Sequence, residues 1–263
     1  MRTPKDLARQ ITVTASEIFC VVGTLFGIGV IGTRVEESSG GALASDATLL
    51  APDGPAFSIW SVIYLGLLAY TIWQWLPRNA TSERHRAIGW LVAASMVLNA
   101  AWLLVTQVGW IWVSVVVIAA LAIVLGLLLA ALLRHPAEGT AEKIITDATF
   151  GLYLGWVTAA TCANVTAAGV ASGWDLGVVG NQVMAVVVLV AAVALGVLFT
   201  LRLGPRFTVI AALAWGITWI GIGRSTSEPL SMAVAVAAFA AAAVLLAFWL
   251  IRWLPQRRAA SAA

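Results

Sequence analysis

The feature that most constrains this fold is a series of eight apolar stretches, each of a length suited to crossing a lipid bilayer. A spanning helix needs about 20 mostly apolar residues. The chain is 61% hydrophobic and 10% charged, with a mean hydropathy of +0.96, which excludes a water-soluble domain of this length. We therefore predict an all-α integral membrane protein, a bundle of about eight transmembrane helices. The stretches cover residues 11–33, 57–76, 88–106, 110–133, 148–170, 179–200, 207–222 and 230–251, and the seventh is the shortest.

The basic residues indicate how these helices are oriented. If the N-terminus is cytoplasmic, all 15 Lys and Arg residues except Arg34 and Arg224 fall on the cytoplasmic side. Cytoplasmic loops of membrane proteins carry such an excess of basic residues. We expect both termini to be cytoplasmic, in a bacterial cytoplasmic membrane. The same residues lie in short loops and form no patch, so we expect no nucleic-acid partner.

Nothing in the sequence indicates a metal site or a required cofactor. We expect His85 and His135 in loops beside arginines, so no histidine lies within an apolar stretch to ligate a haem iron. The cysteines and carboxylates lack metal-ligand spacing, and the sequence contains no evident nucleophile–base pair or phosphate-binding loop. An enzyme is therefore the least favoured class.

The first candidate binding segment is PDGPAFSIWSVIY, residues 52–64. Trp60 and Tyr64 are four residues apart, so they share one helix face, and the preceding loop can fold over that face. This arrangement predicts a pocket with a lid. The alternative is that both residues belong to the aromatic belt at the membrane interface.

Further Trp and Asn residues recur at a similar depth. Asn99 precedes Trp102 by three residues, and Trp156 and Asn164 lie on one later helix. An asparagine in hydrocarbon is costly unless it is hydrogen-bonded, so these amides face other helices or a ligand. A cavity with aromatic walls and a few amides would suit a flat, largely apolar molecule. The predicted ligand-binding residues are Trp60, Tyr64, Asn99, Trp102, Trp156 and Asn164.

Three other features each leave two interpretations open. The long acidic loop 34–56 is either a lid or a flexible tether. Gly23 and Gly27 have GxxxG spacing, which serves either close packing within the chain or a homodimer seam. Glu17 is an intramembrane carboxylate that either couples transport to ions or protons, or bonds locally near the interface.

The motifs around these residues resemble those of the tryptophan-rich sensory protein family, also called the translocator protein or peripheral benzodiazepine receptor family. The family's Pro-Gly segment followed by Trp and Tyr matches Pro52, Gly54, Trp60 and Tyr64. Its Leu-Asn-x-x-Trp matches Leu98, Asn99 and Trp102, and its fifth-helix pattern is similar to Tyr153, Leu154, Trp156, Ala159, Ala160, Thr161 and Asn164. The segment Phe57-Ser58-Ile59-Trp60 departs from the family's Phe-x-Pro-Val-Trp by lacking the proline and one residue.

The resemblance covers residues 11–170 and implies a five-helix core with three additional C-terminal helices. We accordingly expect a ligand-binding core at 1–170 and an extension at 171–263. The resemblance also implies a membrane receptor or sensor that binds porphyrins, other tetrapyrroles or similar flat ligands, with light-dependent porphyrin breakdown among the family's proposed roles. The expected partners are membrane lipid, a small hydrophobic ligand and a second copy of the chain. The alternative function is a secondary transporter of a small hydrophobic substrate.

Overall fold

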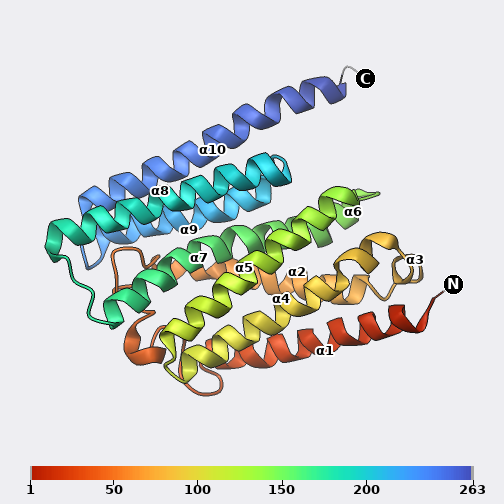
Figure 1. The fold of residues 1–263 in the computed structure, drawn as a ribbon, viewed down its shortest axis with the longest axis horizontal. Coiled ribbons are helices and arrows are strands. Elements are labelled where there is room, and N and C mark those ends of the chain that lie inside the picture. Colours follow the sequence, from red (N-terminus) through yellow and green to blue (C-terminus); the bar gives the residue numbers. More distant parts are fainter. Residues whose placement is uncertain (1, 262–263) are drawn as a thin grey trace. The chain divides into compact units, whose positions relative to one another are not determined.

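The computed structural model describes residues 2–261, with side chains described for residues 2–255. Within this part of the chain there are eight helices long and apolar enough to cross a membrane, and no strand, which confirms the predicted all-α membrane bundle. The elements are α1 (Pro4–Gly27), η1 (Ser38–Gly41), η2 (Gly54–Ser58), α2 (Ile59–Trp73), α3 (Pro77–Ala80), α4 (Glu83–Gln107), α5 (Ile111–Arg134), α6 (Thr140–Glu142), η3 (Lys143–Ala148), α7 (Thr149–Ala171), α8 (Gly177–Leu203), α9 (Phe207–Thr226) and α10 (Met232–Ser261) (Figure 1).

The first helix begins and ends earlier than its apolar stretch predicts. The Thr3 hydroxyl accepts a hydrogen bond from the Asp6 N–H, and the Asp6 carboxylate accepts one from the Thr3 N–H, which forms a capping box. The helix therefore starts at Pro4 rather than at residue 11. It ends at Gly27 rather than at residue 33, because Gly29 adopts a φ of +75° that a right-handed helix cannot contain.

The third spanning helix also extends into polar sequence. Hydropathy predicts a start at residue 88, whereas α4 starts at Glu83 and carries Arg84 and Arg86 in its first turn. Both arginines are paired with carboxylates, so their charges do not end the helix. Hydropathy alone excludes such residues from a span, which is why the predicted start is late.

The chain packs as two compact units. The first unit comprises Met1–Leu43 and Ser58–Phe150, and the second comprises Ala44–Phe57 and Gly151–Ala263. Nearly all of α7 therefore packs with the last three spanning helices. The chain crosses between units within the acidic loop and at the start of α7.

In the first unit, α4 is the central helix, with α1 and α5 packed against it (Figure 1). A Cβ atom built on Gly23 would lie 2.9 Å from the Cα of Ala100, so α1 and α4 approach closely at this point. Gly27 faces the Leu103 side chain in the same way. Both residues of the GxxxG motif thus serve packing within the chain.

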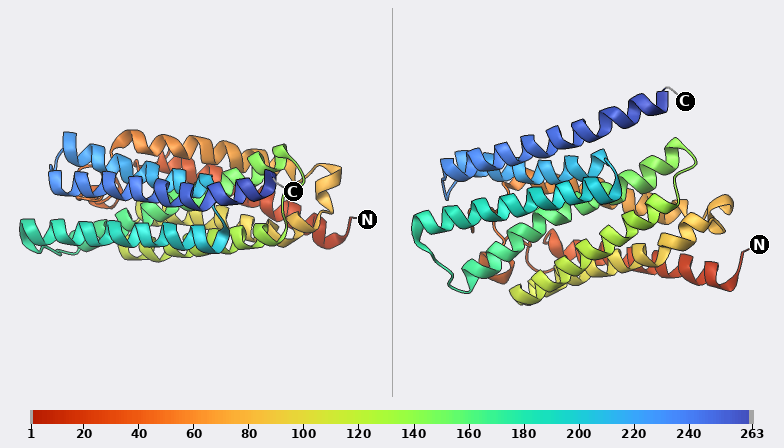
Figure 2. Two further views of the ribbon diagram at one scale, coloured as in Figure 1. Left: turned by 90° about the horizontal axis from the view of Figure 1, so that it is seen from above. Right: turned by 45° about the horizontal axis from the view of Figure 1, so that its top comes forward.

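In the second unit, α10 packs against α8 and α9, and the three run side by side (Figures 1 and 2). Their shared core contains small residues such as Ala185, Ala192 and Ala238, which allow the helices to approach. Leu50 from the acidic loop is fully buried in the same core. Large apolar side chains such as Val187 point out of the unit, as on a lipid-facing helix.

The acidic loop 34–56 is held by specific contacts in both units. In the first unit, the Ser39 hydroxyl donates to the Thr106 carbonyl at 2.9 Å. In the second unit, the Asp53 N–H donates to the Trp219 carbonyl at 3.3 Å, and the Trp215 indole donates to the Ala56 carbonyl at 3.0 Å. These contacts favour a structured loop over the flexible tether.

Candidate ligand-binding site

Trp60 and Tyr64 form a stacked aromatic pair on α2. Their ring centroids are 5.2 Å apart and their planes differ by 14°. The spacing of four residues places both rings on one face of the helix, as the sequence predicts. Both side chains are half-buried, so the pair presents a partly accessible aromatic surface rather than core packing alone.

Asn99 of α4 is the polar partner of this pair. Its amide nitrogen donates to the Tyr64 hydroxyl at 3.2 Å and to the Cys20 sulfur at 3.3 Å, so it links α4 to α2 and α1. Asn99 is fully buried, and its carbonyl oxygen has no hydrogen-bond partner. Leaving a buried acceptor unpaired costs about 1–3 kcal/mol, so this oxygen is a natural attachment point for a donor.

Trp102 and Glu17 lie on the two helices that flank this group. Trp102 follows Asn99 by three residues on α4 and is 8% exposed. Glu17 precedes Cys20 by three residues on α1, interacts electrostatically with Cys20 and Tyr64, and is only 5% exposed. Its Oε2 has no hydrogen-bond partner, so the expected local bond to Ser16 or Thr14 does not satisfy that oxygen.

Trp156 and Asn164, the remaining predicted ligand residues, belong to the second unit. Both lie on α7 and both are about 1% exposed. The Trp156 ring makes an edge-to-face contact with Phe57, with centroids 5.6 Å apart, and lies against Gly216 of α9. The structure thus brings both Trp60 and Asn99 into contact with Tyr64, whereas the contacts of Trp156 are with Phe57 and Gly216.

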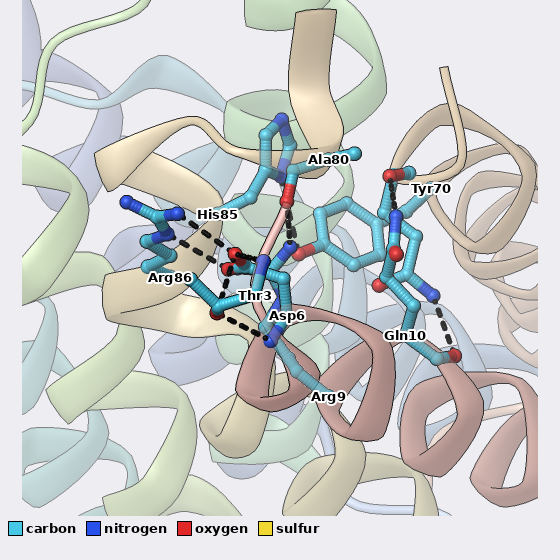
Figure 3. A network of polar contacts seen from close by, with 9 residues as sticks. Thr3, Asp6, Arg9, Gln10, Tyr70, Ala80, His85 and Arg86 are labelled. Atoms are coloured by element: carbon cyan, nitrogen blue, oxygen red, sulfur yellow. Dashed lines mark hydrogen bonds and ion pairs between the residues drawn. The ribbon is translucent and has the colours of Figure 1, made fainter. Parts of the chain in front are cut away.

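A second polar group, which the predicted site does not include, lies at the other end of the first unit (Figure 3). The Arg86 guanidinium donates two hydrogen bonds of 2.7 Å to the Asp6 carboxylate. Arg9 reaches the same carboxylate at 3.4 Å and donates to the Ala80 carbonyl at 2.8 Å. One buried acid therefore joins α1 to α4, and Arg9 joins α1 to α3. The Thr3-Pro4-Lys5-Asp6 capping pattern is the sequence signal that marks this end of α1.

His85 corrects an expectation from the sequence, because it lies in the first turn of α4 rather than in a loop. It is fully buried, its Nδ1 is 3.3 Å from the Tyr70 hydroxyl, and its Nε2 is 3.4 Å from Glu142. On α1, the Gln10 side chain donates to the Gln74 carbonyl at 2.6 Å, and the Gln74 side chain donates to the Gln10 carbonyl at 3.2 Å. The flanking arginines pair with carboxylates, which lets this polar stretch enter a helix.

The described residues contain no group of three or more His, Cys, Asp or Glu side chains arranged to hold a metal ion. The predicted ligand residues that lie together in the first unit are aromatic and amide side chains, namely Trp60, Tyr64 and Asn99. Together with the eight spanning helices, they define a polytopic helical membrane protein with polar and aromatic side chains inside the bundle.

The family follows from comparison with known proteins. A family model described as TSPO-like protein matches residues 10–251, and the chain belongs to this family. This confirms the resemblance seen in the motifs, and the match also includes the three C-terminal spanning helices. No curated protein matches the chain. No solved structure matches it either.

Proposed function

We propose that this membrane protein is a receptor or sensor for a flat hydrophobic ligand such as a porphyrin or another tetrapyrrole. The observation that supports this most directly is the unpaired carbonyl oxygen of the buried Asn99, beside the stacked rings of Trp60 and Tyr64. A flat ligand can stack on an aromatic surface while a donor at its edge bonds the amide. A pyrrole N–H or a protonated carboxyl group supplies such a donor.

The role of each residue follows from its surroundings. The Trp60 indole offers a stacking surface, and Tyr64 is held in place by the bond from Asn99. Trp102, three residues after Asn99 on α4, would offer a further aromatic surface to the ligand. Trp156 and Asn164 stay predicted ligand residues, and their variants are tested separately because they lie in the second unit.

The test is quenching of tryptophan fluorescence by metal-free protoporphyrin in detergent. Saturable quenching is expected for the wild type, with Trp102→Phe weakening binding about three- to tenfold, the range of one aromatic contact. Trp90→Phe is the matched control, because Trp90 lies on the same helix but is 52% exposed. Equal affinity in both variants, or no saturable binding by the wild type, would contradict the proposal. Trp156→Phe and Asn164→Ala then show whether these two residues of the second unit contribute to protoporphyrin binding.

The second candidate function is secondary transport of a small hydrophobic substrate, and one observation favours it. Glu17 is a buried carboxylate with an unpaired oxygen near Tyr64, where a coupling group would have to lie. Uptake into proteoliposomes that depends on a pH gradient in the wild type, and loses that dependence in Glu17→Gln, would support a transporter. Saturable ligand binding without uptake would support the receptor.

We propose a bacterial cytoplasmic membrane with both termini in the cytoplasm. The orientation is supported by the distribution of Lys and Arg, of which only Arg34 and Arg224 are expected on the outer side. Reporter fusions at the two ends of the chain test this orientation. Activity of a periplasm-dependent reporter at either end would refute it.

A further inference from the structure

The second unit contains a cavity of about 750 Å³ that is separate from the predicted ligand residues. Its walls come from the last turns of α7, the first turns of α8, and residues 47–49 and 229–230. None of the six predicted ligand residues is among the described residues that line it. A volume of this size is typical of sites for small organic molecules, which occupy about 300–1,000 Å³.

The lining is apolar along most of its length and polar at one end. Val165, Ala185 and Val188 line the part that lies within the spanning helices. Asp175 and Asn181 line the part at the connection between α7 and α8. From Val178 to Val188 the wall follows α8 for about 15 Å, so an elongated apolar body can lie along it with one end at Asp175.

Asp175 supplies the only charged side chain among the described lining residues. Its Oδ1 accepts hydrogen bonds from the Gly177 N–H at 2.9 Å and the Asn181 amide at 2.8 Å, which fixes the carboxylate and leaves Oδ2 for a ligand. The Asn181 amide, and secondly the Gly177 N–H, hold the pKa of Asp175 below its usual range, so the group is a carboxylate at neutral pH.

The cavity wall is braced by Arg224, a buried residue near the end of α9. The same Nη1 atom donates to the Thr48 carbonyl at 3.0 Å and to the Pro229 carbonyl at 3.2 Å. Thr48 and Pro229 both line the cavity, so two wall segments far apart in the sequence are tied to one guanidinium. Nη1 and Nη2 of Arg224 donate to backbone carbonyls, and the residues that bond the Asp175 carboxylate are Asn181 and Gly177 rather than Arg224.

We infer that this cavity is a second ligand site, for a lipophilic amine whose protonated nitrogen pairs with Asp175 and whose apolar body lies along α7 and α8. A carboxylate at the end of an apolar cavity selects a cation with N–H donors over a neutral or anionic head group. Such an amine has two sources, a free amphiphilic amine or the ammonium group of phosphatidylethanolamine. The inference concerns a site distinct from that of the proposed function, and either can fail without the other.

The first arm of the test measures decylamine and decanol binding to the full chain by calorimetry in detergent. Decylamine is expected to bind saturably and about two- to fivefold more tightly than decanol, the range of an ion pair at an exposed carboxylate such as Asp175. Asp175→Asn should lose that preference, whereas Asp46→Asn, an exposed carboxylate that does not line the cavity, should keep it. Val165→Trp fills the apolar part and should weaken both ligands. Melting temperatures and helical circular dichroism confirm that each variant folds.

The second arm distinguishes the two sources of the amine. The protein is reconstituted in equal amounts of phosphatidylethanolamine and phosphatidylcholine and repurified, and the retained lipid is measured by mass spectrometry. Enrichment of phosphatidylethanolamine in the wild type but not in Asp175→Asn assigns the site to the lipid, and equal retention with decylamine binding assigns it to a free amine. Equal binding of decanol and decylamine would overturn the proposal, as would unchanged decylamine binding in a folded Asp175→Asn or Val165→Trp.

Discussion

The Arg224 guanidinium donates a 2.9 Å hydrogen bond to the backbone carbonyl of Ser45, 179 residues earlier in the chain. The same side chain is 1% exposed and also bonds the carbonyls of Thr48 and Pro229. It therefore fixes the second part of the acidic loop to the end of α9. The sequence places Arg224 in the loop after the stretch 207–222, whereas in the structure it lies in α9 and holds the acidic loop.

Arg224→Met should release this loop and destabilise the second unit. A hydrogen bond to a charged group contributes about 1.5–3 kcal/mol, and three carbonyls lose their donor, so we expect a loss of about 3 kcal/mol or more. Arg202→Met, an exposed arginine in the same unit, is the matched control and should change little. The measurements are unfolding in detergent and proteolysis of residues 44–53. Equal stability of the two variants would show that Arg224 does not hold the loop.

Gly23→Ala should destabilise the first unit, because its Cβ would lie 2.9 Å from the Cα of Ala100, a backbone atom that cannot yield. Overpacking costs about 1–3 kcal/mol, and the gain in helix propensity of about 1 kcal/mol offsets only part of it. Gly126→Ala is the control, since a Cβ on that helical glycine meets nothing within 4 Å. We expect a lower melting temperature for Gly23→Ala and an unchanged or higher one for Gly126→Ala. The same direction of change in both would contradict the packing argument.

Arg84→Met should destabilise the end of the first unit where α4 begins. Arg84 is 5% exposed, lies 3.3 Å from Glu142, and also bonds Asp147 and the His135 carbonyl. Removing one partner of a buried ion pair costs about 3–5 kcal/mol, and the 20% exposure of Asp147 places the expected loss near the lower value.

The controls for Arg84 separate the ion pair from the loss of a charge. Arg134→Met removes an exposed arginine from the same unit and should have little effect. Adding Asp147→Asn to Arg84→Met should restore part of the stability, because it removes one of the stranded carboxylates. A double variant less stable than Arg84→Met alone would show that the pair is not the cause. Unfolding in detergent is the measurement for all three.

Hydropathy predicts the number of spanning helices because a bilayer imposes a minimum apolar length on each. It misplaces the start of α4 because Arg84 and Arg86 are neutralised by carboxylates from other parts of the chain, which no local window includes. It likewise treats Arg224 as a loop residue. A local hydropathy window contains no information on which residues pair with others far away in the sequence.

The candidate site was predictable to the extent that it depends on spacing along one helix. The separation of Trp60 and Tyr64 predicts their shared face, and their rings do stack. The cost of a buried amide predicts that Asn99 bonds other helices, which it does through Tyr64 and Cys20. Spacing does not determine which segments pack together, so it could not predict that the Trp156 ring contacts Phe57.

Asn99→Leu should lower ligand affinity while leaving the stability of the first unit nearly unchanged. Interhelical hydrogen bonds in membranes contribute about 0.6 kcal/mol on average, and the variant also removes the unpaired Asn99 carbonyl oxygen. These effects oppose each other, so the free energy of unfolding should change by less than about 1 kcal/mol. Protoporphyrin affinity should fall by about tenfold, because the acceptor for the ligand's donor is gone.

Tyr64→Phe is the matched control for Asn99→Leu. It removes the hydroxyl that accepts from the Asn99 amide but keeps both the aromatic stack and the unpaired carbonyl oxygen. If that oxygen binds the ligand, Tyr64→Phe should retain most of the protoporphyrin affinity that Asn99→Leu loses. Equal losses in the two variants would mean that the Asn99–Tyr64 bond only shapes the bundle. Quenching titrations and unfolding curves on the same preparations decide between these results.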